Sequence, residues 1–365
     1  MGAALKKHDR FAGLDALRGL AALGVLFWHY GAHFGETPLA AWLSPFYTAG
    51  LYLVDVFFVL SGFLLGTLYR EPSIWRAFLF KRITRLFPLH WMTLLVVAVL
   101  QLGYTQITGT GFIYTHNDLQ HFFLSLGLMQ FVGFQQGFSF NGPAWSISVE
   151  WLVNLIFIVL LCLPRLRGAL TTLLIIGSAV CLWFGAGRVI ESNPLWDWLD
   201  PALMRGVFGF FTGVLLVGIM PSKSAASRMW DGMGLAAGVA LLVFMNSRGL
   251  QQMSGLDFAV VGLAVPAMIA GFIHGDALVK VSQWRGLVWL GEVSFSVYLW
   301  HFPIQIVMGL IVASGTEIPF TSPWVLGGFV VTCYVVGHLS LVFLEKPAQR
   351  AAAVSRPGQW FLRKG

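Results

Sequence analysis

Charged residues are scarce in this chain. Only 11% of its 365 residues are Asp, Glu, Lys or Arg, whereas about one quarter are charged in a typical soluble domain. Hydrophobic residues make up 57% of the sequence, and the mean hydropathy is +0.75. This composition excludes a water-soluble protein. It indicates an integral membrane protein built from helices, because a helix satisfies its own backbone hydrogen bonds in lipid.

Cysteine is rare as well. The three residues, Cys162, Cys181 and Cys333, all lie inside apolar stretches. No second cysteine is near enough in sequence to form a cysteine-rich metal motif. We therefore expect the three to be buried packing residues, and we expect neither a metal site nor a tightly bound cofactor.

Acidic residues are the scarcer charge. The 16 Asp and Glu against 23 Lys and Arg leave a net charge of +7, which could suggest a nucleic-acid partner. However, the basic residues occur in short runs between apolar stretches rather than on one face. Such runs orient membrane spans, because basic loops stay on the cytoplasmic side. Nucleic-acid binding is therefore not expected.

Apolar runs of about 20 residues, the length needed to cross a bilayer, recur along the whole chain. They predict an all-α bundle of about ten transmembrane helices, near residues 14–34, 47–69, 86–108, 145–164, 168–186, 201–220, 231–247, 256–274, 288–312 and 324–344. Residues 119–133 are apolar but shorter, and counting them as a crossing would move Arg165 and Arg167 to the outer side. We expect this segment to be re-entrant or interfacial.

The basic groups then share one face of the membrane: 6–10, 70–85, 165–167, 223–228, 280–285 and 346–364. Both termini are expected to be cytoplasmic. The basic start could belong to a cleaved secretory signal, but Arg18 and His29 bracket the first apolar run and further spans follow at once, so we expect it to be retained. With no repeat or long linker, we expect one membrane domain over 1–347 and a short basic tail over 348–365.

Ionisable residues inside spans are costly, so each cluster of them is a candidate functional site. In the first span, Arg18 precedes His29 by eleven residues, which places both within about 20° of one helix face and about 16 Å apart. Asp15, one turn earlier, is able to pair with Arg18. Alternatively, Arg18 is a topology anchor and His29 an interhelical hydrogen-bonding partner.

A second cluster is basic. Arg82 and Arg85 lie three residues apart beside Lys81 and Arg76. Paired guanidiniums suit a phosphate or pyrophosphate, because each offers a planar fork of donors. The same stretch could instead lie in the interface as an amphipathic helix, or serve only as a positive-inside anchor.

The third cluster opens the fourth span, where Ser146, Glu150 and Asn154 recur every four residues and share one stripe. The alternative for Glu150 is an ion pair with an inward-facing arginine such as Arg205.

The fourth cluster lies in the ninth span, where Ser294, Tyr298 and His301 fall within about 40° of one another. His29, Glu150 and His301 are expected to converge toward the outer half of the membrane, although packing alone would explain His301 equally well. Structural roles are expected for the isolated residues Asp55, His90, Glu292 and His338. Gly209 and Gly213 have the spacing of close helix packing.

A phosphate-binding cluster facing the cytosol and a buried imidazole suggest a donor whose reactive end enters the bilayer. Coenzyme A thioesters have this shape, because the flexible pantetheine arm could span the distance of about 16 Å between the levels of Arg18 and His29. His29 is the best candidate base, since imidazole titrates near working pH and tolerates burial while neutral. We hypothesise that Arg18 neutralises donor or oxyanion charge and that Glu150 orients an imidazole or the acceptor.

Five motifs in this order resemble acyltransferase family 3, a family of bacterial membrane O-acyltransferases. They are Arg18 with His29, the RITR of residues 82–85, NGPAWSISVE at 141–150, SFSVYLWHFP at 294–303 and EKP at 345–347. The resemblance covers residues 10–347. It implies a ten-helix bundle in the bacterial cytoplasmic (inner) membrane that moves acetyl or another short acyl group from acyl-CoA to a sugar hydroxyl of an envelope glycan.

The resemblance also implies roles for residues: His29 with Arg18 is the family's essential pair, and Arg82 with Arg85 its donor-binding motif. The expected site is therefore His29, Arg18 and Glu150 in catalysis, Lys81, Arg82 and Arg85 in donor binding, and Asn141, Trp145, Ser146, Tyr298 and His301 in substrate binding.

Two routes for the acyl group stay open: direct transfer, and an acyl-enzyme on Ser146, Ser294 or His29. A transporter or flippase, with polar residues lining a path and no bond made, is the alternative, and a small diffusible acceptor is another.

Overall fold

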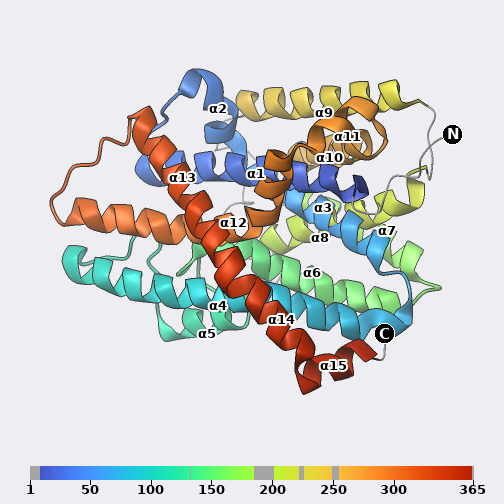
Figure 1. Ribbon diagram of the computed structural model, residues 1–365, viewed down its shortest axis with the longest axis horizontal. Coiled ribbons are helices and arrows are strands. Elements are labelled where there is room, and N and C mark those ends of the chain that lie inside the picture. The colour runs from blue at the N-terminus through green and yellow to red at the C-terminus, as the bar shows by residue number, and fades with distance from the viewer. Residues whose placement is uncertain (1–8, 132, 185–200, 222–225, 249–254, 364–365) are drawn as a thin grey trace.

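The computed structural model describes residues 9–131, 133–184, 201–221, 226–248 and 255–363. In these ranges the chain is helical and contains no strand (Figure 1), which confirms the all-α polytopic fold expected from composition. The basic residues expected at 6–8 and 223–225, the end of the predicted span at 185–186 and the end of the tail lie outside the described residues.

Fifteen α-helices follow one another in the described ranges: α1 (Asp9–Phe34), α2 (Ala40–Ala49), α3 (Leu53–Leu68), α4 (Trp75–Thr108), α5 (Leu119–Leu126), α6 (Trp145–Cys162), α7 (Arg167–Phe184), α8 (Pro201–Ile219), α9 (Ser227–Ser247), α10 (Gly255–His274), α11 (Asp276–Ser282), α12 (Arg285–Ala313), α13 (Pro323–Ser340), α14 (Lys346–Val354) and α15 (Arg356–Arg363). Figure 1 shows α1, α4, α9 and α12 running along the long axis, with α13 lying oblique to them.

Nine of the described helical segments are long and apolar enough to cross a membrane, and they match the expected spans after the first. The remaining expected span is α1, which is 26 residues long but carries Asp15, Arg18, His29 and His33. It packs against α12, α2 and α3, so its polar side chains meet protein instead of lipid. By contrast, α7 and α9 are only 17% buried over their most apolar stretches, as expected for helices at the lipid boundary.

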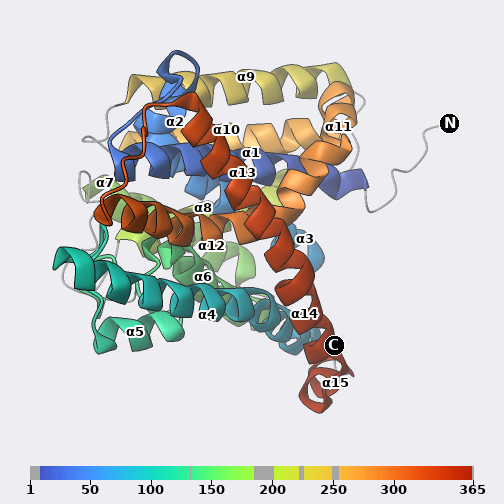
Figure 2. The same cartoon turned by 60° about the vertical axis from the view of Figure 1, so that its left-hand side comes forward.

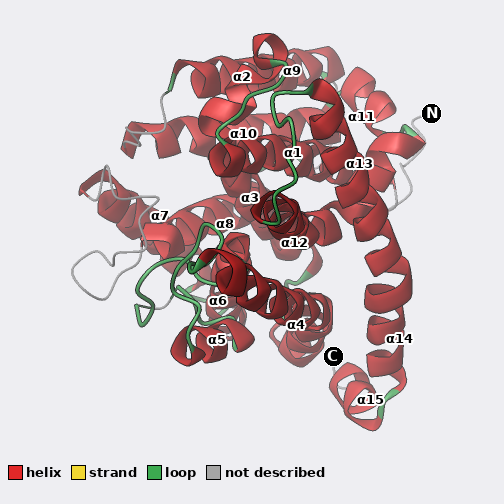
Figure 3. Cartoon of the chain, turned by 90° about the vertical axis from the view of Figure 1, so that its left-hand side faces the viewer, coloured by secondary structure: helices red, strands yellow, loops and turns green. Residues whose placement is uncertain are grey.

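The short apolar segment 119–133 does not cross. It contains α5, which is 8 residues long and therefore spans about 12 Å, and it continues through turns to the start of α6 (Figure 3). This agrees with the expected re-entrant or interfacial segment. The connection over 109–140 places one side of its loops against the interior of the bundle.

The basic stretch before residue 86 is not a separate interfacial helix. It forms the first turns of α4, a continuous helix of 34 residues. Because the helix is unbroken through this region, Arg82 and Arg85 lie on the face of α4 that is directed toward α6 and α12. The arginine pair that is expected to bind phosphate is thereby fixed to a long apolar helix instead of lying loosely on the membrane surface.

The tail expected over 348–365 is helical in its described part. α13 continues through a π-helical turn, Leu341–Glu345, into α14, and the buried Glu345 accepts a hydrogen bond from Ser296 of α12. Figure 2 shows α13 and α14 as an almost continuous rod with α15 turned back at its end. There the Phe361 ring stacks on Phe80 of α4, with ring centroids 5.7 Å apart.

The glycine pair at 209 and 213 packs as its spacing predicts. Both residues face α3, where a Cβ atom at Gly213 would overlap the carbonyl oxygen of Val59. On α3, Gly62 lies equally close to the backbone of α8. Small residues on both helices therefore allow the two backbones to approach closely, which is the main source of helix association where lipid supplies no hydrophobic drive.

We expect Gly213→Ala to destabilise the protein by about 1–3 kcal/mol, because the added methyl group forces α3 and α8 apart. The measurement is thermal unfolding in detergent. Gly218→Ala on the same helix is the matched control, since Gly218 has no neighbour within 4 Å of its Cβ position among the described residues, and it should match or slightly exceed wild type. Equal melting temperatures for the two variants would contradict close packing at Gly213.

The cysteines do not all behave as expected. Cys333 is buried, but Cys162 is exposed and Cys181 only half-buried. The prediction of three buried cysteines is wrong for these two, because an apolar run does not reveal which face of a spanning helix meets neighbouring helices and which meets lipid.

Candidate active site

His29 lies deep in the bundle on α1 and is 4% exposed. Its ring Nδ1 lies 3.1 Å from the carbonyl oxygen of Val25. A carbonyl oxygen only accepts, so Nδ1 carries the proton in the neutral ring and Nε2 keeps a lone pair. The imidazole is therefore oriented as a proton acceptor by its own helix.

Two further imidazoles surround it. The His301 ring on α12 packs against His29 with centroids 4.5 Å apart, and the His33 ring lies 5.2 Å from His29. His301 donates from Nδ1 to the carbonyl oxygen of Tyr298 at 2.6 Å, which leaves its Nε2 unprotonated as well. Three helix-borne rings thus gather at one level of the bundle, as the sequence led us to expect for His29 and His301.

His29 opens onto a cavity of about 190 Å³, here called the histidine cavity. Its lining combines polar and aromatic side chains: Val25, Trp28, His29, His33, Leu51, Val54, Ile113, Tyr114, Phe131, Phe138, Pro143, Trp145, Ala202 and Arg205. Several of these belong to the 109–140 connection, which therefore covers the cavity on one side. His301 is fully buried behind His29 and does not line it.

A second cavity, of about 50 Å³, lies on the Arg18 side of α1 and is here called the central cavity. It is lined by Arg18, Val54, Phe57, Phe58, Arg85, Leu86, Ser146, Ile147, Glu150, Ser294, Phe295 and Tyr298. Arg18 is held by Asp15 at 3.3 Å, which is the pairing expected from their i, i+3 spacing. The polar stripes of α6 and α12 thus face each other across this space.

A hydrogen-bonded group separates the two cavities. Tyr298 donates to the carbonyl oxygen of Pro143 at 2.7 Å and accepts from Ser146 at 2.8 Å. Pro143 lines the histidine cavity, whereas Ser146 and Tyr298 line the central one, and Val54 lines both. The expected substrate-binding residues Ser146 and Tyr298 therefore form a partition between the Arg18 level and the His29 level.

A third cavity, of about 350 Å³, is here called the basic cavity. It is lined by Tyr69, Phe80, Lys81, Arg82, Thr84, Arg85, Gln349, Ala353 and Leu362. All three expected donor-binding residues are among them, and Arg85 also lines the central cavity. α14 and α15 supply the opposite wall, so the segment expected to be a simple tail contributes to the basic cavity.

Glu150 contacts arginine, but not the arginine that sequence reasoning proposed. It pairs with Arg82 at 3.4 Å and accepts from Ser61 at 3.0 Å. The alternative pairing with Arg205 is wrong, because Arg205 pairs with Asp55 at 2.7 Å. Glu150 also lies in the central cavity and not beside an imidazole, so the expected convergence of His29, Glu150 and His301 holds only for the two histidines.

The remaining expected site residues divide into two groups. Trp145 lines the histidine cavity, with its ring 5.2 Å from the Arg205 guanidinium. Asn141 is buried and donates to the carbonyl oxygen of Leu299 at 3.1 Å, and it lines none of the three cavities. Its amide holds the start of the α6 region to α12, which places Trp145 and Ser146.

Sequence reasoning missed two residues that line the histidine cavity. His33 follows His29 by one helical turn and lies 2.8 Å from Gln305, so the i, i+4 spacing of the two histidines was an available signal. Arg205 also had a signal, because it is an arginine inside a predicted span, but sequence reasoning considered it only as an ion-pair partner for Glu150. Across the described ranges, no group of three or more His, Cys, Asp or Glu side chains is placed to hold a metal ion.

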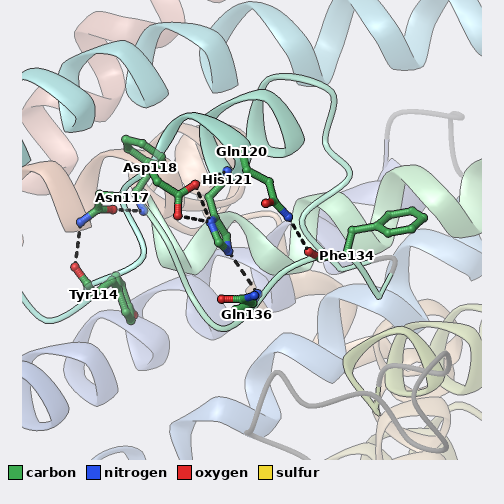
Figure 4. A network of polar contacts seen from close by, with 8 residues as sticks. Tyr114, Asn117, Asp118, Gln120, His121, Phe134 and Gln136 are labelled. Carbon is green, nitrogen blue, oxygen red and sulfur yellow. Dashed lines mark hydrogen bonds and ion pairs between the residues drawn. The ribbon is translucent and has the colours of Figure 1, made fainter.

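A polar network joins several residues of the connection between α4 and α6 (Figure 4). Asp118 accepts from both the backbone N–H and the ring of His121, and the other ring nitrogen of His121 accepts from the backbone N–H of Gln136 at 3.1 Å. Asn117 donates to the Tyr114 carbonyl oxygen at 2.8 Å. The network ties the start of α5 to the chain leading into α6.

The hydrogen bond from the His121 backbone N–H lowers the pKa of the Asp118 carboxyl. Asp118 therefore stabilises the loop above the ordinary aspartate pKa of about 4, and this contribution is lost as the pH falls through its lower folded pKa. We expect Asp118→Ala to weaken the start of α5 by about 1 kcal/mol at neutral pH, as for loss of an N-cap. Limited proteolysis over 109–140 measures this opening.

Glu317→Gln, in another exposed loop, is the control for this experiment and should cleave at the wild-type rate. The difference between Asp118→Ala and wild type should shrink when the experiment is repeated at acidic pH. A difference that stays constant across the acid range would contradict the assignment to the ionised carboxylate.

Comparisons with known proteins identify the family. A family model described as an acyltransferase domain matches residues 11–339. The chain is 26% identical to acyltransferase MdmB of Streptomyces mycarofaciens over 95% of this chain and 94% of that protein. It is 24% identical to O-acetyltransferase OatA of Staphylococcus aureus (strain NCTC 8325 / PS 47), over 93% of this chain and 57% of OatA.

YrhL of Bacillus subtilis (strain 168), which is provisionally named a peptidoglycan O-acetyltransferase, is 24% identical over 93% of this chain. The chain spans about half the length of YrhL, with 55% covered. No solved structure matches. The family model runs from the first turn of α1 to the last turn of α13 and therefore covers every cavity-lining residue except those of α14 and α15. This protein accordingly belongs to acyltransferase family 3 and is a membrane O-acyltransferase.

Proposed function

We propose that this acyltransferase takes an acetyl or other short acyl group from cytoplasmic acyl-CoA and delivers it to a sugar hydroxyl of an envelope glycan. The observation that carries the proposal is the series of three cavities joined by common wall residues. Arg85 lines the basic and central cavities, and Val54 lines the central and histidine cavities. The series leads from guanidiniums suited to phosphate to an imidazole suited to a hydroxyl.

The donor nucleotide occupies the basic cavity in this proposal. Arg82 and Arg85 are fixed on one helix and present forked donors to the phosphates, while Lys81 adds a mobile charge at the rim. The pantetheine arm then passes Arg18 through the central cavity. Because that cavity measures only about 50 Å³, the arm has to displace the Arg82 guanidinium from Glu150 or move the Ser146–Tyr298 partition as it enters.

The reaction takes place beside His29. The acceptor hydroxyl oxygen bonds to the acyl carbon, and its proton passes to the Nε2 lone pair of His29. The tetrahedral oxyanion collapses, the C–S bond breaks, and its electron pair leaves on the coenzyme A sulfur. That thiolate takes up the proton from His29 or one from water. A thiol with a pKa near about 8.5 leaves with little acid assistance, so the base is the essential protein group.

A sugar acceptor is supported by the lining of the histidine cavity. Trp145, Phe138 and Tyr114 offer ring faces to the apolar side of a pyranose, and Arg205 and His33 offer polar contacts. The volume of about 190 Å³ suits one small group, because drug-sized ligands occupy about 300–1,000 Å³. The peptidoglycan named for YrhL is consistent with a carbohydrate of this kind.

The test is direct transfer by the purified protein in lipid nanodiscs. It is incubated with acetyl-CoA and a soluble peptidoglycan or polysaccharide fragment, free coenzyme A is measured with a thiol reagent, and the acceptor is analysed by mass spectrometry. We expect coenzyme A release to match the acetyl groups gained by the sugar. Passage of an unmodified glycan across a vesicle membrane, without coenzyme A release, would instead identify a transporter.

A further inference from the structure

Arg205 is the most deeply buried cation of the site, at 2% exposure, and it reaches the histidine cavity from α8. Asp55 of α3 grips it through two contacts: Nε to Oδ1 at 3.2 Å and Nη2 to Oδ2 at 2.7 Å. Nη2 also donates to the carbonyl oxygen of Leu51 at 3.2 Å. The guanidinium therefore has one fixed orientation.

Its remaining nitrogen is available to a ligand. The hydrogen bonds above use Nε and Nη2, and Nη1 makes none to any residue that the structure describes. The face of the guanidinium rests on Trp145 at 5.2 Å and on Phe258 at 5.8 Å. The guanidinium is thus held against two aromatic rings, in a cavity that His29 also lines.

Arg18 is poorly placed for the oxyanion that the reaction creates. It lies about 16 Å from His29 along α1, lines the central cavity, and is separated from the histidine cavity by the Ser146–Tyr298 partition. Arg205 is the one arginine or lysine among the described residues that line the histidine cavity. The charge that develops beside His29 therefore has Arg205 as its cationic neighbour.

Resting on the function proposed above, we infer that Arg205 stabilises the tetrahedral oxyanion of acyl transfer through Nη1, and that Asp55 is its positioning residue. As the acceptor oxygen bonds to the acyl carbon, the carbonyl π electrons move onto the acyl oxygen, which accepts the hydrogen bond from Nη1. They return when the C–S bond breaks. Donors fixed in advance in a low-dielectric site are effective here, because no reorganisation is needed as the charge forms.

The experiment separates this role from a purely structural ion pair. Removing one partner of a buried pair strands the other charge, whereas replacing both by apolar residues of similar volume is often neutral or stabilising. We therefore compare Arg205→Met, Asp55→Leu and the double variant Arg205→Met/Asp55→Leu. The readouts are melting temperature in detergent and the kcat and KM of acetyl transfer. Arg165→Met, at an exposed position, is the matched control.

We expect the double variant to regain at least the wild-type melting temperature while its kcat stays about 10²- to 10³-fold low, the usual cost of losing an oxyanion donor, with KM for acetyl-CoA unchanged. Wild-type turnover in the double variant would overturn the inference and leave the pair structural. Loss confined to KM for the acceptor would overturn it too, because Arg205 would then bind substrate and transition state equally.

Arg205→Lys guards against a double variant that does not fold. Lysine keeps the charge opposite Asp55 but lacks the fork, so we expect normal membrane levels with kcat reduced at least about tenfold. Wild-type kcat in Arg205→Lys would overturn the role given to Nη1. If wild-type protein itself releases no coenzyme A with any acceptor, the proposed function fails, and this outcome is distinct from an active wild type with an active double variant.

Discussion

Replacing His29 with alanine should reduce acyl transfer by about 10²- to 10⁴-fold, the range that a general base contributes. The Nδ1 hydrogen bond to Val25 leaves Nε2 as the proton acceptor of a ring that lines the histidine cavity, so alanine removes the proton acceptor and leaves the basic cavity intact. The measurement is acetyl transfer by protein purified to equal amounts, with acetyl-CoA binding measured in parallel. Binding should be unchanged.

His338→Ala is the matched control for this experiment. His338 is another histidine of a spanning helix, but it is exposed and contacts Trp289 at 3.2 Å, away from the three cavities. The His338→Ala variant should transfer acetyl at the wild-type rate. If His29→Ala is as active as His338→Ala, another group removes the acceptor proton and the role given to His29 is wrong.

Removing the charges of Arg82 and Arg85 together should raise the KM for acyl-CoA by about 100-fold or more, because each charge-assisted hydrogen bond contributes about 1.5–3 kcal/mol. Arg85→Ala alone should have the larger single effect. Arg85 lines both the basic and the central cavity, whereas Arg82 is already paired with Glu150. KM for the acceptor should change little. Initial rates over a range of both substrates give the two constants.

Arg285→Ala, an exposed cation at the start of α12, controls for loss of positive charge near the predicted cytoplasmic face. It should leave both constants at wild-type values. An unchanged KM for acyl-CoA in the Arg82/Arg85 variant would mean that the nucleotide binds elsewhere and that these arginines are topology anchors, the reading left open by their sequence alone.

Much of the fold follows from residue patterns. Apolar length located the spans, the distribution of Lys and Arg excluded a crossing at 119–133, and helical periodicity put Arg18 and His29 on one interior face. These predictions succeed because each depends on a single helix meeting lipid or protein. The Gly209–Gly213 spacing succeeded for the same reason, since a groove of small residues is a property of one helix surface.

Predictions that required knowing which helices are neighbours did less well. Glu150 and Asp55 are both carboxylates within spans, and sequence alone could not decide which of them meets Arg205. The exposed Cys162 was misjudged because lipid and packed protein favour the same apolar residues. The contribution of α15 to the basic cavity depends on a chain reversal after residue 354 that brings Phe361 back onto Phe80, and polar composition near a terminus does not encode such a reversal.

The partition made by Tyr298, Ser146 and Pro143 has a consequence beyond catalysis. In the proposed function, one end of the interior meets coenzyme A and the other end meets a glycan. An open path between the two ends would leak ions, and each charge that crosses would dissipate about 2.3 kcal/mol per 100 mV of membrane potential. The hydroxyl of Tyr298 and its two hydrogen-bond partners lie where the central and histidine cavities adjoin. We therefore expect the side chains that the acyl chain passes in the proposed reaction also to limit ion leakage between turnovers.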